Sequence, residues 1–591
     1  MTLARFDDLT PGTERSFGFE EPVGVLEARR PEEVPGVIEA ADAAAEHGLW
    51  AAGFVAYEGA RGLNPDLAVQ ASAEGGPFAD LPLAWFGLFE RCMDTAPLEP
   101  PARVADRPPS APWRPSVQRD AYDAALERIH ERIAAGDTYQ VNHTIRLRAT
   151  VAGDDRGLYR DLCLAQRGGY AAYLSTGRYH VASASPELFF RLDGDQITTR
   201  PMKGTAPRGR WLEEDEEIVR RLLDSAKDRA ENAMIVDLLR NDLGRIAAAG
   251  SVRWDELFHA ERYETVWQLT STIGAELCPG TGLLDVFRAL FPSGSVTGAP
   301  KVATMRVIAD LEDSPRGVYC GAIGYLGPPG AAEPRANFNV AIRTVVVDTT
   351  TGLAEYGVGG GVTWDSSASG EYEEILAKAR VLTAARPAFT LFETLRWSPG
   401  DGFAHLAEHL RRVRSSAAYF GFRCDDAAVR AALKDAVVAH TGSVRVRLDL
   451  ERDGTVRVEV KDPPSPGEGP IRIAIDDDPV DPTDMWLFHK TSHRGVYDRR
   501  RAKRPDVEDV VLVNSRGEVT ETTIANLAVQ IDTGWVTPPR AAGLLAGTFR
   551  DVLLREGHLR ERPITLEEFR EAEAVALVSS VRGWREAEVV P

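Results

Sequence analysis

The chain has 591 residues, of which 43% are hydrophobic and 27% are charged, and its formal net charge is −20. This length predicts at least two globular domains, since domains run about 100–200 residues. The negative charge argues against nucleic acid or an anionic membrane as a general partner, so an anionic substrate needs a local basic pocket. No run approaches the ~18 apolar residues of a membrane span. A signal-peptide core and CxxC pairs are also missing, so the cytoplasm is the expected compartment.

Lysine is scarce among the 69 basic residues. The eight lysines are Lys203, Lys227, Lys301, Lys378, Lys434, Lys461, Lys490 and Lys503. Guanidinium does not lose its proton in practice, so an arginine-rich chain is expected to keep lysine where an amine must act as a nucleophile. Lys203 stands out because it lies between the proline and the glycine of RPMKGT. The alternative is an ordinary solvated lysine.

The first elements in chain order predict a core and a connector. Residues 1–93 contain short apolar runs that indicate buried strands. Residues 94–116 are proline-rich and predict an extended surface connector. Apolar residues at spacings of three to four predict a helix over Arg119–Ala135, and Tyr139–Val151 is typical of a strand.

The segment Ser183–Thr205 predicts a hairpin that turns at Asp193–Gly194. If the two strands pair about that turn, Glu187 faces residue 200 and Lys203 lies just beyond it. The carboxylate and the amine then lie at the same open end of the hairpin. The alternative is a cross-strand ion pair without chemistry.

Two helices are predicted further along, over Trp211–Ile246 and Glu371–Leu382. The first places Glu231 in line with apolar positions, and the second places Glu374 four residues before Lys378. Carboxylates from two helices are what a magnesium ion needs when a substrate supplies further oxygens. A surface ion pair between Glu374 and Lys378 explains the same spacing.

Three glycine-rich segments lie between these helices, at Phe291–Lys301, Tyr319–Gly327 and Tyr356–Ser366. Their exposed backbone N–H groups can hold a carboxylate or a phosphate. None has the spacing of a nucleotide-binding loop. A strand predicted over Asn337–Val347 carries Arg343, whose guanidinium suits a carboxylate. Together these features indicate an enzyme that acts on a small polycarboxylate.

Residues 1–385 closely resemble the chorismate-utilising enzymes, which include anthranilate, isochorismate, salicylate and aminodeoxychorismate synthases. The matching motifs are GDTYQVN, SASPELF, PMKGT, ENAMIVDLLRNDLGRI, FPSGSVTGAPK, CGAIGYL, NVAIRT and EYEEILAKA. The lysine of PMKGT resembles that of aminodeoxychorismate synthases, because anthranilate synthases typically have alanine there. The resemblance implies an N-terminal subdomain with its connector over residues 1–118 and a catalytic core over residues 119–385.

The resemblance also implies roles for single residues. Lys203 is expected to attack C2 of chorismate as the C4 hydroxyl leaves, with Glu187 as the acid/base at C4, before ammonia enters at C4 and expels the lysine. Glu231 and Glu374 are expected to bind Mg²⁺. The expected substrate contacts are Arg343, Lys378, Thr297, Gly298, Tyr325, Gly359, Gly360 and Gly361.

One position departs from the family pattern. Many relatives have a histidine where this chain has Gln268, in VWQLTS. Glutamine keeps a hydrogen-bond donor but cannot carry a proton, so any acid–base work there passes to Glu187 or water. None of the five cysteines lies in a glycine-rich nucleophile elbow. A separate glutamine amidotransferase subunit is therefore the expected source of ammonia.

A second domain is predicted over residues 386–591, after a boundary at Ala385–Pro387. It opens with a strand at Phe389–Trp397 and a helix at Ala404–Phe420. Alternation around an Asp-Gly turn predicts a hairpin over Val444–Val460. DPPSPGEGP, at residues 462–470, is expected to be an interdomain loop.

The chemical candidates of this half are a lysine, an acid and a helix start. Lys490 lies in LFHKTSHRG and Glu521 in VTETTIANLAV, while Gly543–Leu554 predicts a turn that enters a helix whose first N–H groups can hold a phosphate. A lysine, an acidic partner for a ring nitrogen and a phosphate site together indicate pyridoxal phosphate.

This half resembles the fold-type IV pyridoxal-phosphate enzymes through FETLR, HLRRV, TETTIAN, LAGTFR and VSSVRGW. The resemblance implies that Lys490 binds the cofactor covalently and later removes the C4 proton, and that Glu521 holds its pyridine nitrogen. It further implies that Arg412, Thr548 and Ser580 contact the phosphate, that Arg582 meets a substrate carboxylate, and that a homodimer forms through this domain. This half is expected to be a lyase that releases pyruvate to give 4-aminobenzoate, a precursor of folate. The main reason is that it is fused to a half that resembles aminodeoxychorismate synthases.

The expected fold class is therefore α+β, with a large antiparallel β-sandwich and helices followed by a fold-type IV α/β domain. Two alternatives remain at this point. One is an anthranilate or other chorismate synthase fused to an aminotransferase, against which Lys203 argues. The other is a non-catalytic scaffold, which the two lysines and their acidic partners disfavour.

Overall fold

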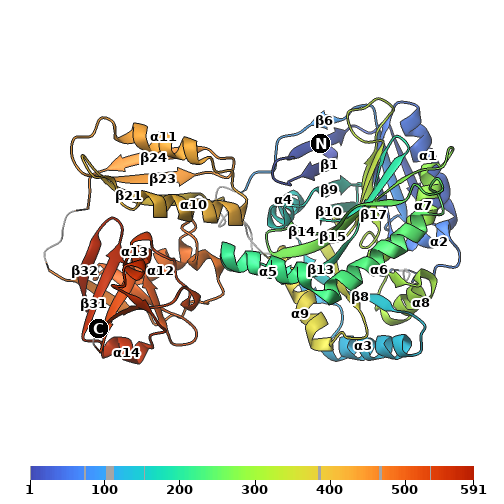
Figure 1. Ribbon diagram of the computed structural model, residues 1–591. Coiled ribbons are helices and arrows are strands. Elements are labelled where there is room, and N and C mark those ends of the chain that lie inside the picture. Colours follow the sequence, from blue (N-terminus) through green and yellow to red (C-terminus); the bar gives the residue numbers. More distant parts are fainter. Residues whose placement is uncertain are drawn as a thin grey trace. The chain divides into compact units, whose positions relative to one another are not determined.

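The computed structural model describes residues 2–71, 75–100, 112–151, 153–383, 388–464, 469–532 and 534–591 (Figure 1). The chain divides into two compact units. Unit 1 comprises Met1–Arg208 and Val219–Pro387, and unit 2 comprises Gly209–Ile218 and Ala388–Pro591. The domain boundary predicted at Ala385–Pro387 lies outside the described residues, as do parts of the predicted connector at 94–116 and of the predicted loop at 462–470.

Unit 1 contains two large sheets, in which neighbouring strands are antiparallel throughout the described residues. The first has the order β16 (Gly298–Ala299), β8 (Gln140–Thr150), β20 (Leu353–Val362), β19 (Thr344–Asp348), β10 (Tyr179–Ser185), β9 (Tyr170–Ser175), β1 (Thr2–Asp8), β2 (Arg15–Glu20) and β6 (Met93–Asp94), with β7 (Arg114–Pro115) beside β8. The second has the order β13 (Met202–Pro207), β15 (Val266–Glu276), β12 (Gln196–Arg200), β11 (Leu188–Asp193), β18 (Ala336–Val340), β17 (Ala322–Leu326), β4 (Trp50–Val55), β5 (Ala84–Phe89) and β3 (Gly24–Ala28), with β14 (Arg253–Arg262) beside β15.

The two sheets pack face to face through a shared aromatic core. Phe6 and Phe17 of the first sheet lie 5.1 and 5.3 Å from the ring of Tyr325 in the second. Helices cover both outer faces. The second sheet packs on α1 (Val34–Glu46), α6 (Ala226–Leu243) and α7 (Leu283–Leu290). The first sheet packs on α3 (Arg119–Ala134), α4 (Asp155–Gln166), α8 (Lys301–Leu311) and α9 (Ala368–Ala379). The predicted β-sandwich with helices is confirmed.

Several local predictions in unit 1 are confirmed. Helix α3 and strand β8 lie where the periodicity places them. Strands β11 and β12 form the predicted hairpin, with Gly194 at a φ of 59° in the turn. Leu188 lies opposite Arg200, so Glu187 reaches the open end of the hairpin as expected.

Two predicted elements are divided in the structure. The helix predicted over Trp211–Ile246 is two helices, α5 (Leu212–Asp224) and α6, because the Ser225 side chain accepts a hydrogen bond from the Asp228 N–H and starts a new helix. The strand predicted over Asn337–Val347 is two strands, β18 and β19, which belong to different sheets. Arg343 lies between them at a φ of 52°.

Unit 2 contains a four-stranded and an eight-stranded sheet. The first has the order β22 (Gly402–Phe403), β21 (Leu391–Ser398), β23 (Val444–Leu450) and β24 (Val456–Lys461). The second has the order β27 (Val519–Thr522), β26 (Asp509–Val513), β25 (Ile471–Ile475), β32 (Gly583–Val589), β31 (Ala574–Ser579), β28 (Asn526–Ile531), β29 (Gly534–Thr537) and β30 (Arg560–Glu561). The helices within Ala388–Pro591 are α10 (Leu406–Phe420), α11 (Asp426–Val437), α12 (Gly495–Lys503), α13 (Thr548–Arg555) and α14 (Leu566–Arg570).

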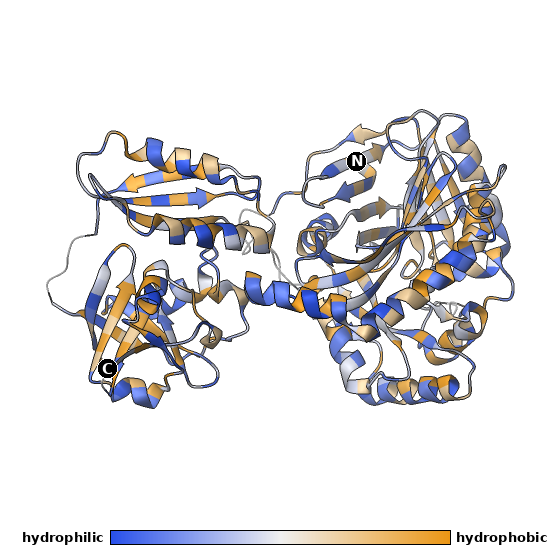
Figure 2. Cartoon of the chain, viewed as in Figure 1, coloured by the Kyte–Doolittle hydropathy of each residue, from blue (hydrophilic) through white to orange (hydrophobic). Residues whose placement is uncertain are grey.

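The hairpin predicted at Val444–Val460 is confirmed by the pairing of β23 with β24. Helices such as α10 and α11 carry apolar and polar residues together, so that one face can pack on a sheet (Figure 2). Among the described residues, no helix has the length and apolar character that crossing a bilayer requires.

Candidate active sites

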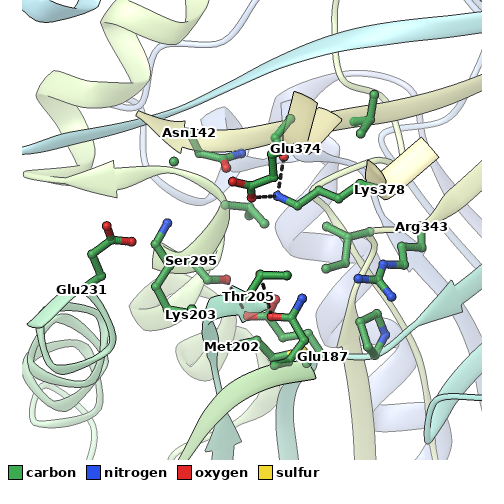
Figure 3. Close-up of a pocket in the computed structure, with 18 of the residues that line it drawn as sticks. Asn142, Glu187, Met202, Lys203, Thr205, Glu231, Ser295, Arg343, Glu374 and Lys378 are labelled. Carbon is green, nitrogen blue, oxygen red and sulfur yellow. Dashed lines mark hydrogen bonds and ion pairs between the residues drawn. The ribbon is translucent and has the colours of Figure 1, made fainter. Parts of the chain in front are cut away.

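A cavity in unit 1 lies where strands β13, β15 and β20 meet helices α6 and α9 (Figure 3). Lys203 projects into it from β13 and is partly buried. A Cβ added at Gly361 of β20 would lie 2.2 Å from Lys203 Nζ. The glycine therefore leaves the space that the amine occupies, and a larger side chain there would have to displace the amine.

Glu187 lies in the same cavity, where Ser295 Oγ donates a hydrogen bond of 2.6 Å to its carboxyl group. Burial raises the pKa of Glu187 to about 7. Burial also lowers the pKa of Lys203, although the nearby Glu231 opposes this effect. No ion pair joins Glu187 to Lys203 among the described residues of unit 1. A protonated carboxyl group is therefore accessible near neutral pH, and the pKa of the amine is shifted in the direction that favours the neutral form a nucleophile requires.

A second group of carboxylates faces this pair from α6 and α9. Glu374 forms the predicted ion pair with Lys378, at 2.7 Å, and Lys378 Nζ also donates to the Gly359 carbonyl at 2.8 Å. Glu231 comes from α6, and Glu371 Oε2 is buried with no hydrogen-bond partner among the described residues. The described residues contain no ready-made group of three His, Cys, Asp or Glu ligands. Two carboxylates and an unpartnered oxygen suit a hard divalent cation that takes its other oxygens from substrate and water.

Arg343 and Gln268 complete the wall of the cavity. Arg343 is buried and donates to Gln166 Oε1, and burial lowers its pKa. Gln268 accepts a hydrogen bond of 3.2 Å from Thr205 Oγ1. Its amide is thus engaged by the strand that carries Lys203, and it offers no titratable group to the reaction.

Four residues predicted as substrate contacts are absent from the lining of this cavity. Tyr325 packs in the aromatic core between the sheets. Thr297 donates to the Ser293 carbonyl, and a Cβ at Gly298 would lie 2.0 Å from the Gln140 carbonyl. A Cβ at Gly360 would point at Glu371 Oε2. The matching motifs therefore include packing positions as well as positions that line the cavity.

The cavity also includes Asn142, Ser295 and Glu371, none of which was singled out from the sequence. Ser295 lies in the glycine-rich segment Phe291–Lys301, and Glu371 lies three residues before Glu374. The helical spacing of Glu371 and Glu374 was the available evidence that they share a face.

A second cavity, in unit 2, is lined by all six residues predicted for that half: Arg412, Lys490, Glu521, Thr548, Ser580 and Arg582. Lys490 Nζ lies 4.6 Å from the centre of the Phe392 ring. Burial and the nearby Arg412 lower the pKa of Lys490 to about 7. The amine is therefore available in its neutral form near pH 7.

Glu521 is buried and held by three donors. Tyr497 Oη and the Leu545 N–H donate to one oxygen at 2.9 and 3.1 Å, and Asn526 Nδ2 donates to the other at 3.2 Å. Burial raises the pKa of Glu521 to about 8. A cationic ring nitrogen beside this carboxyl group would favour its ionised form.

Arg412 lies at the other end of the cavity, beside the start of α13. Glu393 accepts two hydrogen bonds from it, of 2.8 and 2.6 Å. Although burial acts in the opposite direction, Arg412 and His409 lower the pKa of Glu393 to about 2. Helix α13 begins at Thr548, after Gly547, which has no side chain to cap the first N–H groups. An arginine, a hydroxyl and free helix-start N–H groups are a donor set that fits a phosphate.

Three further arginines line this cavity: Arg445, Arg447 and Arg494. Arg445 and Arg447 are two residues apart on β23, so both project from the same face of the strand. The alternation of VRVRL predicts a hairpin, and it also places these two cations side by side.

Comparisons with known proteins agree with this division. Residues 12–384 match the family described as chorismate binding enzyme, and residues 390–589 match amino-transferase class IV. The aminodeoxychorismate synthase of Streptomyces griseus is 41% identical over 311 residues, which are 51% of this chain and 42% of that protein. The aminodeoxychorismate synthase component 1 of Escherichia coli (strain K12) is 41% identical over 266 residues, 45% of this chain and 57% of that protein.

The chain thus spans about half the length of these two relatives. Among solved structures, anthranilate synthase component I from Streptococcus pneumoniae aligns with a TM-score of 0.52 and 25% identity. That alignment covers 63% of this chain and 92% of the other.

Proposed function

The chain belongs to the chorismate binding enzymes, and from this premise we propose that it makes 4-aminobenzoate from chorismate in two steps. The first step, in unit 1, replaces the C4 hydroxyl of chorismate by an amino group from ammonia. The second, in unit 2, eliminates pyruvate from the resulting 4-amino-4-deoxychorismate. The observation that carries the proposal is the presence of Lys203 and Glu187 in one cavity, with pKa values shifted toward a neutral amine and a protonated acid.

In the first step, Lys203 Nζ forms a bond to C2 of chorismate while the ring double bond shifts and the C4 hydroxyl departs. Glu187 gives that hydroxyl a proton, so that it leaves as water. Ammonia then bonds to C4, the double bond returns, and Lys203 leaves as the free amine. Chorismate and ammonia thus become aminodeoxychorismate and water.

Arg343 and Lys378, which line the cavity, would bind carboxylates of the substrate. Glu231 and Glu374 would hold Mg²⁺, which neutralises carboxylate charge when bound. We further propose that ammonia comes from a separate glutamine amidotransferase subunit, and that free ammonium replaces it in vitro.

In unit 2, Lys490, Glu521, Arg412, Thr548 and Ser580 would hold pyridoxal phosphate, which supplies an electron sink when bound. Lys490, neutral in part near pH 7, would take the C4 proton of aminodeoxychorismate. Loss of that proton and of the enolpyruvyl group gives an aromatic ring and pyruvate. Arg582 would bind a substrate carboxylate. We also propose that the chain forms a homodimer through unit 2, which its mass in solution would test.

The decisive experiment supplies chorismate, ammonium and Mg²⁺ to the purified chain with and without pyridoxal phosphate, and separates the products by chromatography. Aminodeoxychorismate is expected to accumulate without the cofactor, and 4-aminobenzoate with pyruvate is expected to appear with it. Absence of aminodeoxychorismate in both reactions would refute the proposal.

A second candidate is an anthranilate synthase fused to an aminotransferase. It is favoured by the structural likeness to anthranilate synthase component I. The same chromatography separates the two, since this candidate gives 2-aminobenzoate without pyridoxal phosphate.

A further inference from the structure

Unit 2 contains a ten-residue segment that comes from far earlier in the sequence than its other residues. This docking segment, Gly209–Ile218, groups with Ala388–Pro591, whereas the residues on either side of it belong to unit 1. It begins six residues after Lys203, shortly after strand β13 ends at Pro207. The Ala388–Pro591 portion is therefore only part of the unit that holds Lys490.

Apolar contacts anchor the docking segment. The Trp211 ring lies 5.1 Å from that of Phe488 and packs against a buried cluster that includes Leu487 and Tyr497. The Arg540 guanidinium lies 4.7 Å from the same indole ring. Leu212 packs on a second cluster. A tryptophan that contacts both an aromatic ring and a guanidinium is typical of an anchoring residue.

Backbone carbonyls of the docking segment receive two side-chain hydrogen bonds. Tyr419 Oη donates to the Gly209 carbonyl at 2.6 Å, and His489 Nε2 donates to the Arg210 carbonyl at 3.1 Å. Because a carbonyl only accepts, Nε2 must carry a proton, and Nδ1 can then accept from Ser416 Oγ at 2.9 Å. The Tyr419 ring stacks on the imidazole, with centres 4.4 Å apart. The segment thereby fixes the orientation of a buried histidine.

His489 is the residue before Lys490. On the other side of this strand-like stretch, the Lys490 carbonyl accepts a hydrogen bond of 3.0 Å from the Phe392 N–H. The backbone at Lys490 is thus held by β21 on one side and, through His489, by the docking segment on the other. We propose that Gly209–Ile218 is a positioning element for Lys490, supplied to the cofactor site of unit 2 from within the chorismate-binding sequence. This inference rests on the proposed function of unit 2.

The first test compares full-length Trp211→Ala with wild type and with Trp254→Ala, a control at an indole that is 56% exposed on β14. Trp211→Ala is expected to lose pyridoxal phosphate about tenfold faster on dilution and to shift the pH midpoint of its visible absorbance. Trp211→Phe should restore both properties. Retention and titration equal to wild type in Trp211→Ala would overturn the proposal.

The second test uses His489, because removal of Trp211 can also unfold the unit. His489→Gln keeps a donor near Nε2, whereas His489→Leu removes it. Cofactor loss is expected to be faster in the leucine variant than in the glutamine variant, with chorismate consumption unchanged in both. Equal retention in the two variants would contradict a positioning role for the Arg210 hydrogen bond.

A third measurement separates this inference from the proposed function. Amide hydrogen exchange over residues 485–495 is compared in cofactor-free wild type and Trp211→Ala. Faster exchange in the variant supports the docking of Gly209–Ile218. Failure of the wild type to take up pyridoxal phosphate would refute the proposed function of unit 2, but it would leave this result on docking intact. Equal exchange would overturn the docking role.

Discussion

The Lys203 and Lys490 cavities each pair a lysine with a carboxyl group of raised pKa, but the charges around the two pairs differ. Five carboxyl groups line the first cavity, Glu187, Asp228, Glu231, Glu371 and Glu374, against four cationic side chains, Lys203, Lys227, Arg343 and Lys378. One carboxyl group lines the second, Glu521, against six cationic side chains, Arg412, Arg445, Arg447, Lys490, Arg494 and Arg582.

This difference indicates how each site would hold an anion. The second cavity has enough cationic side chains to bind a phosphate and carboxylates directly. In the first, the carboxylates offset the cations, so a dicarboxylate such as chorismate gains little net attraction. A divalent cation between Glu231, Glu374 and the substrate would reverse that balance. Each lysine thus lies near a carboxyl group of raised pKa, but the two cavities would attract an anionic substrate differently. The second would bind it directly through cationic side chains, and the first through a divalent cation.

The sharpest way to separate the two sites is to remove Lys203. Lys203→Ala is expected to lower ammonia-dependent formation of aminodeoxychorismate by about 10³-fold or more, because a methyl group cannot form the covalent bond. Release of pyruvate from supplied aminodeoxychorismate should be unchanged. Lys434→Ala, at an exposed lysine, is the control. Near-normal turnover in Lys203→Ala would refute the covalent role.

The reciprocal change is Lys490→Ala. It should abolish 4-aminobenzoate formation to a similar extent and remove the visible absorbance of the bound cofactor, since the lysine that binds it is gone. Chorismate consumption should continue, with aminodeoxychorismate accumulating in place of 4-aminobenzoate. If both activities fell together, the two cavities would not be independent sites.

Much of the fold could be predicted because its patterns are local. The turn at Gly194 brings Glu187 to the open end of the hairpin, although Leu188 rather than Glu187 lies opposite Arg200, and the apolar spacing gave α3 within a residue at its end. The break at Ser225 was missed, because the helical periodicity continues across a residue that also caps a helix. The docking of Gly209–Ile218 was missed because its partners lie about 200 residues away or more in the sequence.

Some residues of the candidate sites could be predicted from the sequence, and others could not. Lys203 and Lys490 stood out through the scarcity of lysine, and their acidic partners through motifs. Tyr325 and Gly298 were placed in the site because they lie in matching motifs, yet one packs between the sheets and the other against β8. Arg445 and Arg447 lie in no matched motif. A sequence motif identifies residues that the fold or the site requires. It does not show which of them pack in the core and which line the cavity, because that depends on contacts in the folded structure.

Removal of divalent metal ions tests the difference in charge between the acidic first cavity and the basic second cavity. Chelation of divalent ions is expected to slow the synthase step about 100-fold and leave the elimination step unchanged, because only the first cavity needs a cation to offset its carboxylates. Glu374→Gln should raise the Mg²⁺ concentration that gives half-maximal synthase rate. An equal loss of both steps on chelation would contradict this account.

The pH dependence of the two cavities should differ. The acid form of Glu187 declines as pH rises through its pKa of about 7, so the synthase rate, measured at a fixed concentration of free ammonia, should stop rising above that value even though the neutral form of Lys203 continues to increase. Neutral Lys490 increases as pH rises through its pKa of about 7, so the rate of cofactor capture by the cofactor-free chain should rise over the same range. Rate profiles that rise together would rule out Glu187 as the acid.

The smallest expected effect concerns how the second cavity orients its substrate. The Arg447 guanidinium lies 4.2 Å from the centre of the Phe392 ring, which also lies under Lys490, and Asp449 holds it at 2.7 Å. Arg447→Met should raise the KM for aminodeoxychorismate about tenfold and change kcat little, because it removes one carboxylate contact and leaves the lysine in place. Arg457→Met, on the neighbouring strand β24 with a side chain that is 72% exposed, is the matched control. A fall in kcat with unchanged KM would instead mean that Arg447 acts on Lys490 through Phe392. The arginine would then affect the reactivity of the amine and not the binding of a substrate carboxylate.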